Sequence, residues 1–187
     1  MDGNAATSIA SKEDRGLINR MVSEPPGRNT AFIWQVRTLI EQGAFAEAGS
    51  LIAALRNDPI FPKRLEGALE EVQSYWFYKQ GLWDSAAHHL VEALGEANNK
   101  QEKARWEYLA AQLFERKGLN EQAKDWYNKA IVHTTDPIMD IYARLNLIRI
   151  NKEGGDNYID QNIAELMKMV RREKYVDYRD VIYYMAA

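Results

Sequence analysis

Cysteine is absent from the 187-residue sequence, which excludes disulfides, thiolate nucleophiles and cysteine-ligated metal sites. No apolar run approaches the roughly 18 residues that a membrane-spanning helix needs. The N-terminal stretch has no basic region followed by an apolar one, so it does not have the pattern of a signal peptide. A basic surplus is also missing, because the net charge is −3. These absences argue against nucleic acid as a partner and against direct membrane insertion by this segment.

Catalytic candidates are few, and the sequence holds only three histidines. His88 and His89 are adjacent, which places them about 100 degrees apart on a helix, so they cannot share a metal ion. His133 stands alone near an expected helix end, with no serine or carboxylate at a telling spacing. The Gly-Gly-Asp of residues 154–156 lacks the Gly-Lys-Ser/Thr of a phosphate loop and is interpreted as a helix–helix turn. The sequence therefore predicts a protein that is not an enzyme and has no cofactor or metal site.

The clearest positive pattern is a helix–turn–helix unit between residues 103 and 134. Apolar residues recur three or four positions apart in both halves, which is the spacing of one helical face. The first half contains Trp106, Leu109, Ala110, Leu113 and Phe114. The second half contains Ala123, Trp126, Tyr127, Ala130 and Ile131. Gly118 separates the halves, and glycine readily takes the left-handed conformation that closes a helix.

This unit recurs along the chain. The glycine of each turn is followed five residues later by an alanine, as Gly43 and Ala48, Gly81 and Ala86, and Gly118 and Ala123. The glycines are 38 and 37 residues apart, which is close to the 34 residues of a tetratricopeptide repeat. The excess falls in loops expected at residues 56–63 and 95–101. The alternative is an ordinary helical bundle with chance alanines, because the first helices keep only the small residue and last aromatic of the tetratricopeptide signature.

We therefore predict an all-α fold, a tetratricopeptide-like α-solenoid of antiparallel helix pairs that wind into a right-handed superhelical arc. Residues 1–28 are interpreted as a frayed tail and a short helix at 11–22. Residues 29–187 form the repeat array, with Asn29 or Thr30 capping its first helix. The units cover about 29–60, 61–98, 99–135 and 136–175, and a further unit starts at 176–187. Since the last unit lacks its second helix, we expect an internal fragment of a longer array.

A candidate protein-binding groove follows from this architecture. In stacked helix pairs the first helices line the concave side. Aromatic residues and arginine are the residue types most often found in binding hot spots. Three tyrosines, two arginines and one glutamine lie off the buried stripe of the expected first helices. They are Arg37, Tyr75, Tyr78, Tyr108, Gln112 and Arg149. The equally weighted alternative is that the tyrosines pack between repeats.

From Pro62 onward the chain resembles a known family. The segments that carry the resemblance are PKRLEGALEEVQSYWFYKQGLWDSAAHHL, KQEKARWEYLAAQLFERKG, DPIMDIYARLNLIRI and IAELMKMVRREKYVDYRDVIYYMAA. The last is the most specific, with Leu166 to Met169, Glu173, Lys174, Tyr178, Arg179 and Asp180 before Ile182, Tyr183 and Tyr184. They are similar to the tetratricopeptide lipoproteins of type IX secretion and gliding motility, the SprE and PorW type, over about residues 30–187.

The resemblance implies a periplasmic scaffold attached to the outer membrane, with components of the secretion or motility machinery as partners, or the remainder of the parent chain. It supplies no catalytic residues. The family's lipid-attachment cysteine is missing here, as expected of an internal segment. The alternative is a cytoplasmic tetratricopeptide adaptor that binds peptide segments of partner proteins.

Overall fold

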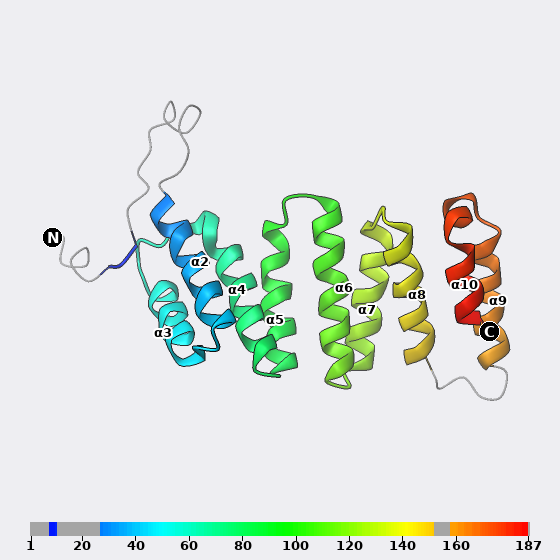
Figure 1. Cartoon of the computed structure of the whole chain (residues 1–187), viewed down its shortest axis with the longest axis horizontal. Coiled ribbons are helices and arrows are strands. Elements are labelled where there is room, and N and C mark those ends of the chain that lie inside the picture. The colour runs from blue at the N-terminus through cyan, green and yellow to red at the C-terminus, as the bar shows by residue number, and fades with distance from the viewer. Residues whose placement is uncertain (1–7, 11–26, 152–157, 187) are drawn as a thin grey trace, which may run out of the picture. The chain divides into compact units, whose positions relative to one another are not determined.

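The computed structural model describes residues 8–10, 27–151 and 158–186, and these residues are helical or lie in turns and loops (Figure 1). The α-helices are α2 (Gly27–Glu41), α3 (Phe45–Arg56), α4 (Glu66–Lys79), α5 (Trp83–Ala93), α6 (Lys100–Arg116), α7 (Asn120–His133), α8 (Pro137–Ile150), α9 (Tyr158–Val170) and α10 (Arg179–Ala186). Three 3-10 helices are η1 (Lys63–Leu65), η2 (Leu94–Glu96) and η3 (Glu173–Tyr178). No strand occurs among the described residues, which confirms the all-α prediction.

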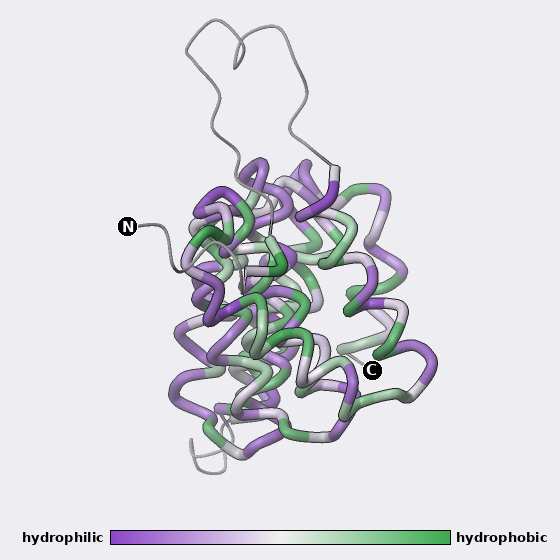
Figure 2. Tube along the Cα trace, turned by 90° about the vertical axis from the view of Figure 1, so that its left-hand side faces the viewer, coloured by the Kyte–Doolittle hydropathy of each residue, from purple (hydrophilic) through white to green (hydrophobic). Residues whose placement is uncertain are grey.

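The chain divides into two compact parts, Met1–Glu96 and Ala97–Ala187, called the N-terminal and C-terminal parts below. The division falls in the loop that the sequence places at 95–101. Hydrophobic and hydrophilic residues alternate along the helices (Figure 2), as expected where each helix buries one face. No helix in the described ranges is both long and apolar enough to cross a membrane.

The N-terminal part consists of two helix hairpins, α2 with α3 and α4 with α5 (Figure 1). Helix α4 also packs against α2 and α3, so the hairpins share one core. The residues of this N-terminal core are Ile33, Val36, Ile40, Ala48, Ile52, Leu55, Leu69 and Val72. Helices α2 and α3 lie within the first predicted unit, 29–60, apart from the first two residues of α2, and the second predicted unit, 61–98, contains η1, α4 and α5.

The C-terminal part contains the α6–α7 hairpin, against which α8 packs through α7. Asp136 caps α8 by accepting a hydrogen bond from the Ile138 amide at 2.9 Å, and Pro137 is the first helical residue, a position at which proline is favoured. A second core contains Ile141, Leu166, Met169, Val170, Tyr175 and Ile182. Helix α10, expected to start a unit without a partner, packs against α9 and η3.

Three hairpin turns share one geometry. Gly43, Gly81 and Gly118 have φ of 75, 74 and 81 degrees, and they are the residues with positive φ in the described part of the chain. In each turn the amide after the glycine donates to a carbonyl five residues earlier, as in Leu119 to Phe114 at 2.9 Å. This is the hydrogen bond of a glycine-terminated helix end. The alanines five residues after the glycines, Ala48, Ala86 and Ala123, are fully buried, which confirms the predicted register of the second helices.

The first helices deviate from the predicted faces. Leu109 was expected to be buried but is 40% exposed, and Glu107 is buried instead. The buried face of α6 is rotated toward Ala104, Glu107, Ala110, Ala111 and Phe114. Small side chains there let α7 approach closely, and His133 of α7 contacts the Glu107 carboxylate at 2.7 Å. The polar residue is therefore tolerated inside because it has a partner.

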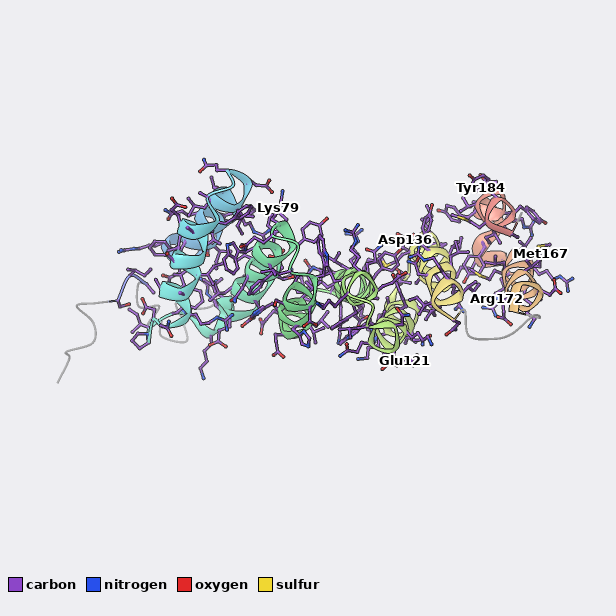
Figure 3. The ribbon with its side chains drawn as sticks, turned by 90° about the horizontal axis from the view of Figure 1, so that it is seen from below. Lys79, Glu121, Asp136, Met167, Arg172 and Tyr184 are labelled. Carbon is purple, nitrogen blue, oxygen red and sulfur yellow. The ribbon has the colours of Figure 1, made fainter. Side chains whose placement is uncertain are left out.

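Other predicted positions also differ. Asn29 does not cap α2, because the helix already begins at Gly27 and Asn29 is buried within it. Ile163 and Met167 lie at helical spacing on α9 but are both exposed, and Figure 3 shows Met167 directed outward. The buried side of α9 is formed by Leu166, Met169 and Val170, which face the second core. The predicted helix at 11–22 and the turn at 154–155 lie outside the described residues.

Candidate protein-binding surfaces

In the N-terminal part, α2 and α4 are joined by polar contacts between side chains 34 or 38 residues apart. Arg37 donates a hydrogen bond to the Glu71 carboxylate, and the Tyr75 hydroxyl donates to the Glu41 carboxylate. Lys79 lies at the end of α4, with its Nζ 3.2 Å from Glu41 Oε2 (Figure 3). The hydrogen bonds from Tyr75 and Lys79 hold the pKa of Glu41 below its usual range. These contacts fix both helices side by side and orient their outward side chains.

Aromatic rings and cations share this face. Trp34 is 64% exposed, and the Arg37 guanidinium lies 5.5 Å from its ring centroid. The rings of Tyr75 and Tyr78 stack with centroids 6.3 Å apart, and the Lys79 ammonium lies 5.2 Å from the Tyr75 centroid. We call this set the α2–α4 surface; it comprises Trp34, Arg37, Glu41, Tyr75, Tyr78 and Lys79. Because neighbouring side chains already order the rings, a binding partner has little side-chain entropy to remove.

Tyr78 extends the aromatic set toward the next helix. Its ring meets Trp83, the first residue of α5, edge to face at 5.4 Å, yet the side chain remains 38% exposed. A tyrosine held in this way offers an apolar ring together with a hydroxyl that can bind a partner.

In the C-terminal part, α6 and α8 present a second set of contacts at the same spacing. Asn146 Nδ2 donates to the Tyr108 hydroxyl at 3.0 Å, and Arg149 donates to the Glu115 carboxylate at 2.6 Å. The hydroxyl of Tyr127, which is fully buried on α7, donates to the other oxygen of Glu115 at 2.7 Å. Glu115 therefore joins α6 to both α7 and α8. We call the outward residues Tyr108, Gln112, Glu115, Asn146 and Arg149 the α6–α8 surface.

Burial governs the ionisation of the two tyrosines of this region. The rings of Tyr108 and Tyr127 meet edge to face at 5.5 Å. Burial raises the pKa of Tyr108. Burial, together with the hydrogen bond to Glu115, raises the pKa of Tyr127 far above its usual value. Both hydroxyls are therefore neutral donors or acceptors at physiological pH.

The six predicted groove residues fall into two groups of three. Arg37, Tyr75 and Tyr78 come together on the α2–α4 surface. Tyr108 and Arg149 both take part in contacts between α6 and α8, and half-buried Gln112 lies one turn along α6 from Tyr108. Tyr108 also packs on Tyr127, and half-buried Tyr75 packs against the N-terminal core. For these two tyrosines the alternative of packing applies beside any role in binding.

The sequence reading missed Trp34, Glu41 and Lys79 in the first group. Helical spacing could have indicated two of them. Trp34 precedes Arg37 by three residues and Lys79 follows Tyr75 by four, which are the spacings of side chains on one helical face. Asn146 was missed in the second group, because its partner lies 38 residues away in the sequence.

Two histidines pair with carboxylates across their hairpins. His89 Nδ1 lies 2.6 Å from Glu70 Oε2, with the imidazole stacked 5.1 Å from the Phe77 ring. His133 contacts Glu107, a carboxylate that the sequence reading did not associate with it. Each of these two histidines therefore bridges the two helices of its hairpin. In the ranges that the structure covers, no group of three or more His, Cys, Asp or Glu residues could hold a metal ion.

Comparison of the chain with protein-family models, curated proteins and solved structures finds no match to any of the three.

Proposed function

We propose that the chain is a non-enzymatic scaffold for protein–protein interactions. The observation that carries the proposal is the α2–α4 surface, where exposed Trp34 and Tyr78 accompany Arg37 and Lys79 on two packed helices. Tryptophan, tyrosine and arginine are the side chains that most often anchor protein interfaces. The rings are oriented before any partner arrives, which favours binding through lower ordering costs.

We further propose that the helices form a tetratricopeptide-like α-solenoid. The support for this proposal is the regular spacing of equivalent features along the chain. The three hairpin turns are glycine-terminated at intervals of 38 and 37 residues, and first helices contact each other through residues 34 or 38 apart in both parts. A right-handed superhelical arc would be elongated. Small-angle scattering should therefore give a radius of gyration clearly above the ~16 Å of a compact domain of this length. A value at that figure would contradict the solenoid.

The cellular role that we propose is the one implied by the resemblance of residues 30–187 to SprE and PorW proteins. In that role the chain is part of a periplasmic, outer-membrane-associated lipoprotein, and its surfaces bind components of type IX secretion or gliding motility. Fractionation of cells with an antibody against this chain tests the location. Recovery with outer-membrane vesicles supports the envelope role, whereas recovery with the cytosol supports a peptide-binding adaptor.

The binding role is tested by removing the two exposed rings. The double variant Trp34→Ala and Tyr78→Ala should keep wild-type helical content, because neither side chain is part of the N-terminal core. Truncation of a true anchor costs about 2 kcal/mol of binding free energy or more, so photo-crosslinked partners identified by mass spectrometry should decrease at least about 10-fold.

The matched control is Val132→Ala, which truncates a 77% exposed side chain on α7 outside both surfaces. Unchanged crosslinking in the double variant would overturn the assignment of the α2–α4 surface. Loss of helical content in the double variant would show that the rings are structural.

A further inference from the structure

Residues 8–10 are bound to the N-terminal part through one carboxylate, although the sequence reading assigned them to a frayed tail. Asp58 Oδ2 accepts hydrogen bonds from the backbone amides of Ile9 at 2.8 Å and Ala10 at 2.9 Å. Asp58 Oδ1 accepts a hydrogen bond from the Ser8 hydroxyl. Three consecutive residues thus donate to a single side chain. In Figure 1 this short blue segment lies beside the loop between α3 and α4.

Apolar contacts accompany the hydrogen bonds. Ile9 packs against the N-terminal core, and Ala10 is only 7% exposed. Phe61, from the same loop as Asp58, also packs against this core. The segment is therefore recognised through its backbone amides, one hydroxyl, one aliphatic side chain and one small side chain.

The loop holds Asp58 in place by contacts of its own. The Ile60 amide donates to Asp58 Oδ1 at 3.1 Å, and the Phe61 amide donates to the Asp58 carbonyl at 3.1 Å. The Asp58 amide donates to Leu55 at the end of α3 at 3.2 Å. Because these bonds do not involve residues 8–10, the loop orients the carboxylate independently of the segment that it binds.

Asp58 accepts hydrogen bonds from backbone amides and a hydroxyl group, and among the described residues it forms no salt bridge. Within the described residues it has no cationic partner, so its charge is balanced by N–H and O–H groups alone. Burial would raise the pKa of the Asp58 carboxyl, but the hydrogen bonds, led by that from Ala10, hold it below its usual range. The group is therefore ionised at neutral pH, and hydrogen bonds to an ionised acceptor are about twice as strong as neutral ones.

We propose that Asp58 and the adjoining apolar surface form a docking site for an extended peptide segment with a hydroxyl residue, an aliphatic residue and a small residue in succession. Residues 8–10 fill this site in cis. A segment of the same chemistry in another protein binds there by displacing them. The site is separate from the α2–α4 surface, because Asp58 precedes α4 whereas Tyr75, Tyr78 and Lys79 lie in the last five residues of that helix.

Residues 8–10 compete with any partner segment for the Asp58 site. A tethered segment has an effective concentration in the millimolar range at its own site. A partner of equal intrinsic affinity therefore binds poorly until residues 8–10 are released. Partners that bind the intact chain must contact more of its surface than the tripeptide does.

The test uses the full-length chain with Ile9→Asp, which places a second negative charge beside Asp58 and removes the aliphatic contact. A fluorescent peptide of residues 5–13 is titrated against this variant and followed by anisotropy. We expect saturable binding with a Kd of about 0.1 mM or tighter, and binding to the wild-type chain at least about 10-fold weaker, because a cis segment at millimolar effective concentration then occupies most of the sites. Adding Asp58→Asn to the variant should weaken peptide binding at least about 10-fold, because the amide cannot accept all the donors.

Two controls separate backbone recognition from general stickiness. A peptide methylated on the backbone nitrogens of Ile9 and Ala10 keeps its side chains and should lose at least about 10-fold in affinity. Asp125→Asn, at an exposed aspartate of α7, should leave peptide binding unchanged. If Ile9→Asp alters the far-UV circular dichroism spectrum, a chain lacking residues 2–10 replaces it in the same titration.

The proposal is overturned by no saturable binding to a folded variant, by equal binding after Asp58→Asn, or by equal binding of the methylated peptide. Equal affinity of the wild-type chain and the Ile9→Asp variant would show that residues 8–10 do not occupy the site. Sedimentation of the wild-type chain should give a monomer mass. A dimer that dissociates on Asp58→Asn would assign the site to the segment of a second copy and refute occupancy in cis.

Discussion

Replacing Asp140 by asparagine removes the charge of the side chain but keeps its shape. Among substitutions of this kind in the C-terminal part, we expect Asp140→Asn to be the most destabilising. Asp140 is 2% exposed and joins α8 to η3. Its carboxylate accepts hydrogen bonds from Arg144 Nε at 2.8 Å, Lys174 Nζ at 2.6 Å and the Tyr175 hydroxyl at 2.6 Å. Tyr175 is itself buried at 1% exposure, so this bond is screened from water.

The magnitude follows from the exposure of the partners. The buried bond from Tyr175 to a charged acceptor contributes about 1.5 to 3 kcal/mol. The side chains of Arg144 and Lys174 are 34% and 41% exposed, so each ion pair contributes at most about 1 kcal/mol. Asparagine keeps one acceptor but removes the charge, and we expect a loss of about 2 to 4 kcal/mol at neutral pH.

The pH dependence has a definite sign. Burial would raise the pKa of Asp140, but the bonds from Lys174 and Tyr175 and the charge of Arg144 outweigh it, so the folded pKa lies below the usual value. A lowered folded pKa adds stability above the unfolded pKa of about 3.9, and this stability is lost as the pH falls through the folded pKa. The difference between wild type and Asp140→Asn should therefore shrink in acid.

Urea unfolding followed by far-UV circular dichroism measures the free-energy difference, and hydrogen exchange locates it in α8, η3 and α10. Asp177→Asn is the control, because Asp177 is an exposed aspartate of η3. A double-mutant cycle with Tyr175→Phe should give a coupling of about 1 to 2 kcal/mol. A loss below about 0.5 kcal/mol, or a loss independent of pH between neutral and strongly acidic conditions, would refute the reasoning.

Three further predictions concern helix packing. Ala86→Leu and Ala123→Leu should each cost about 1 to 3 kcal/mol by overpacking fully buried positions, and unchanged melting temperatures in both would reject the register. Gly118→Ala, at φ +81 degrees, should cost about 1 to 2 kcal/mol in thermal or urea unfolding, and a neutral effect would contradict the left-handed turn. Gly49→Val should lower the melting temperature, because a Cβ there lies 2.9 Å from the Trp76 indole; an unchanged value would place Trp76 elsewhere.

The hairpin turns and second helices could be predicted because their determinants are local. Gly118 and Ala123 act through backbone conformation and side-chain size within a few residues of the chain. The same rules placed Ala48 and Ala86. By contrast, the burial of Glu107 depends on His133, 26 residues later, and the docking of residues 8–10 depends on Asp58. Periodicity cannot detect partners at such separations, so these features required the structure.

The candidate surfaces were partly predictable for a related reason. Tyr75 and Tyr78 could be assigned to an outward face from helical spacing, but which cations and carboxylates oriented them could not. The contact between Tyr75 and Glu41 spans 34 residues and depends on how α2 and α4 pack. A repeat period tells which helices become neighbours, whereas the pairing of individual side chains depends on the rotation of each helix about its axis.

Comparison of equivalent positions in consecutive units separates the residues that the fold requires from those that it does not. Shifting the second unit by the 37 residues between Gly81 and Gly118 pairs Tyr75 with Gln112 and Tyr78 with Glu115. The turn glycine and the buried alanine are the same in both units, but these outward residues change from aromatic to polar or charged. If packing between helices dictated them, similar side chains would be expected at both positions. The fold therefore does not require an aromatic residue at these positions in every unit, and we infer that exposed Tyr78 belongs to the proposed protein-binding surface.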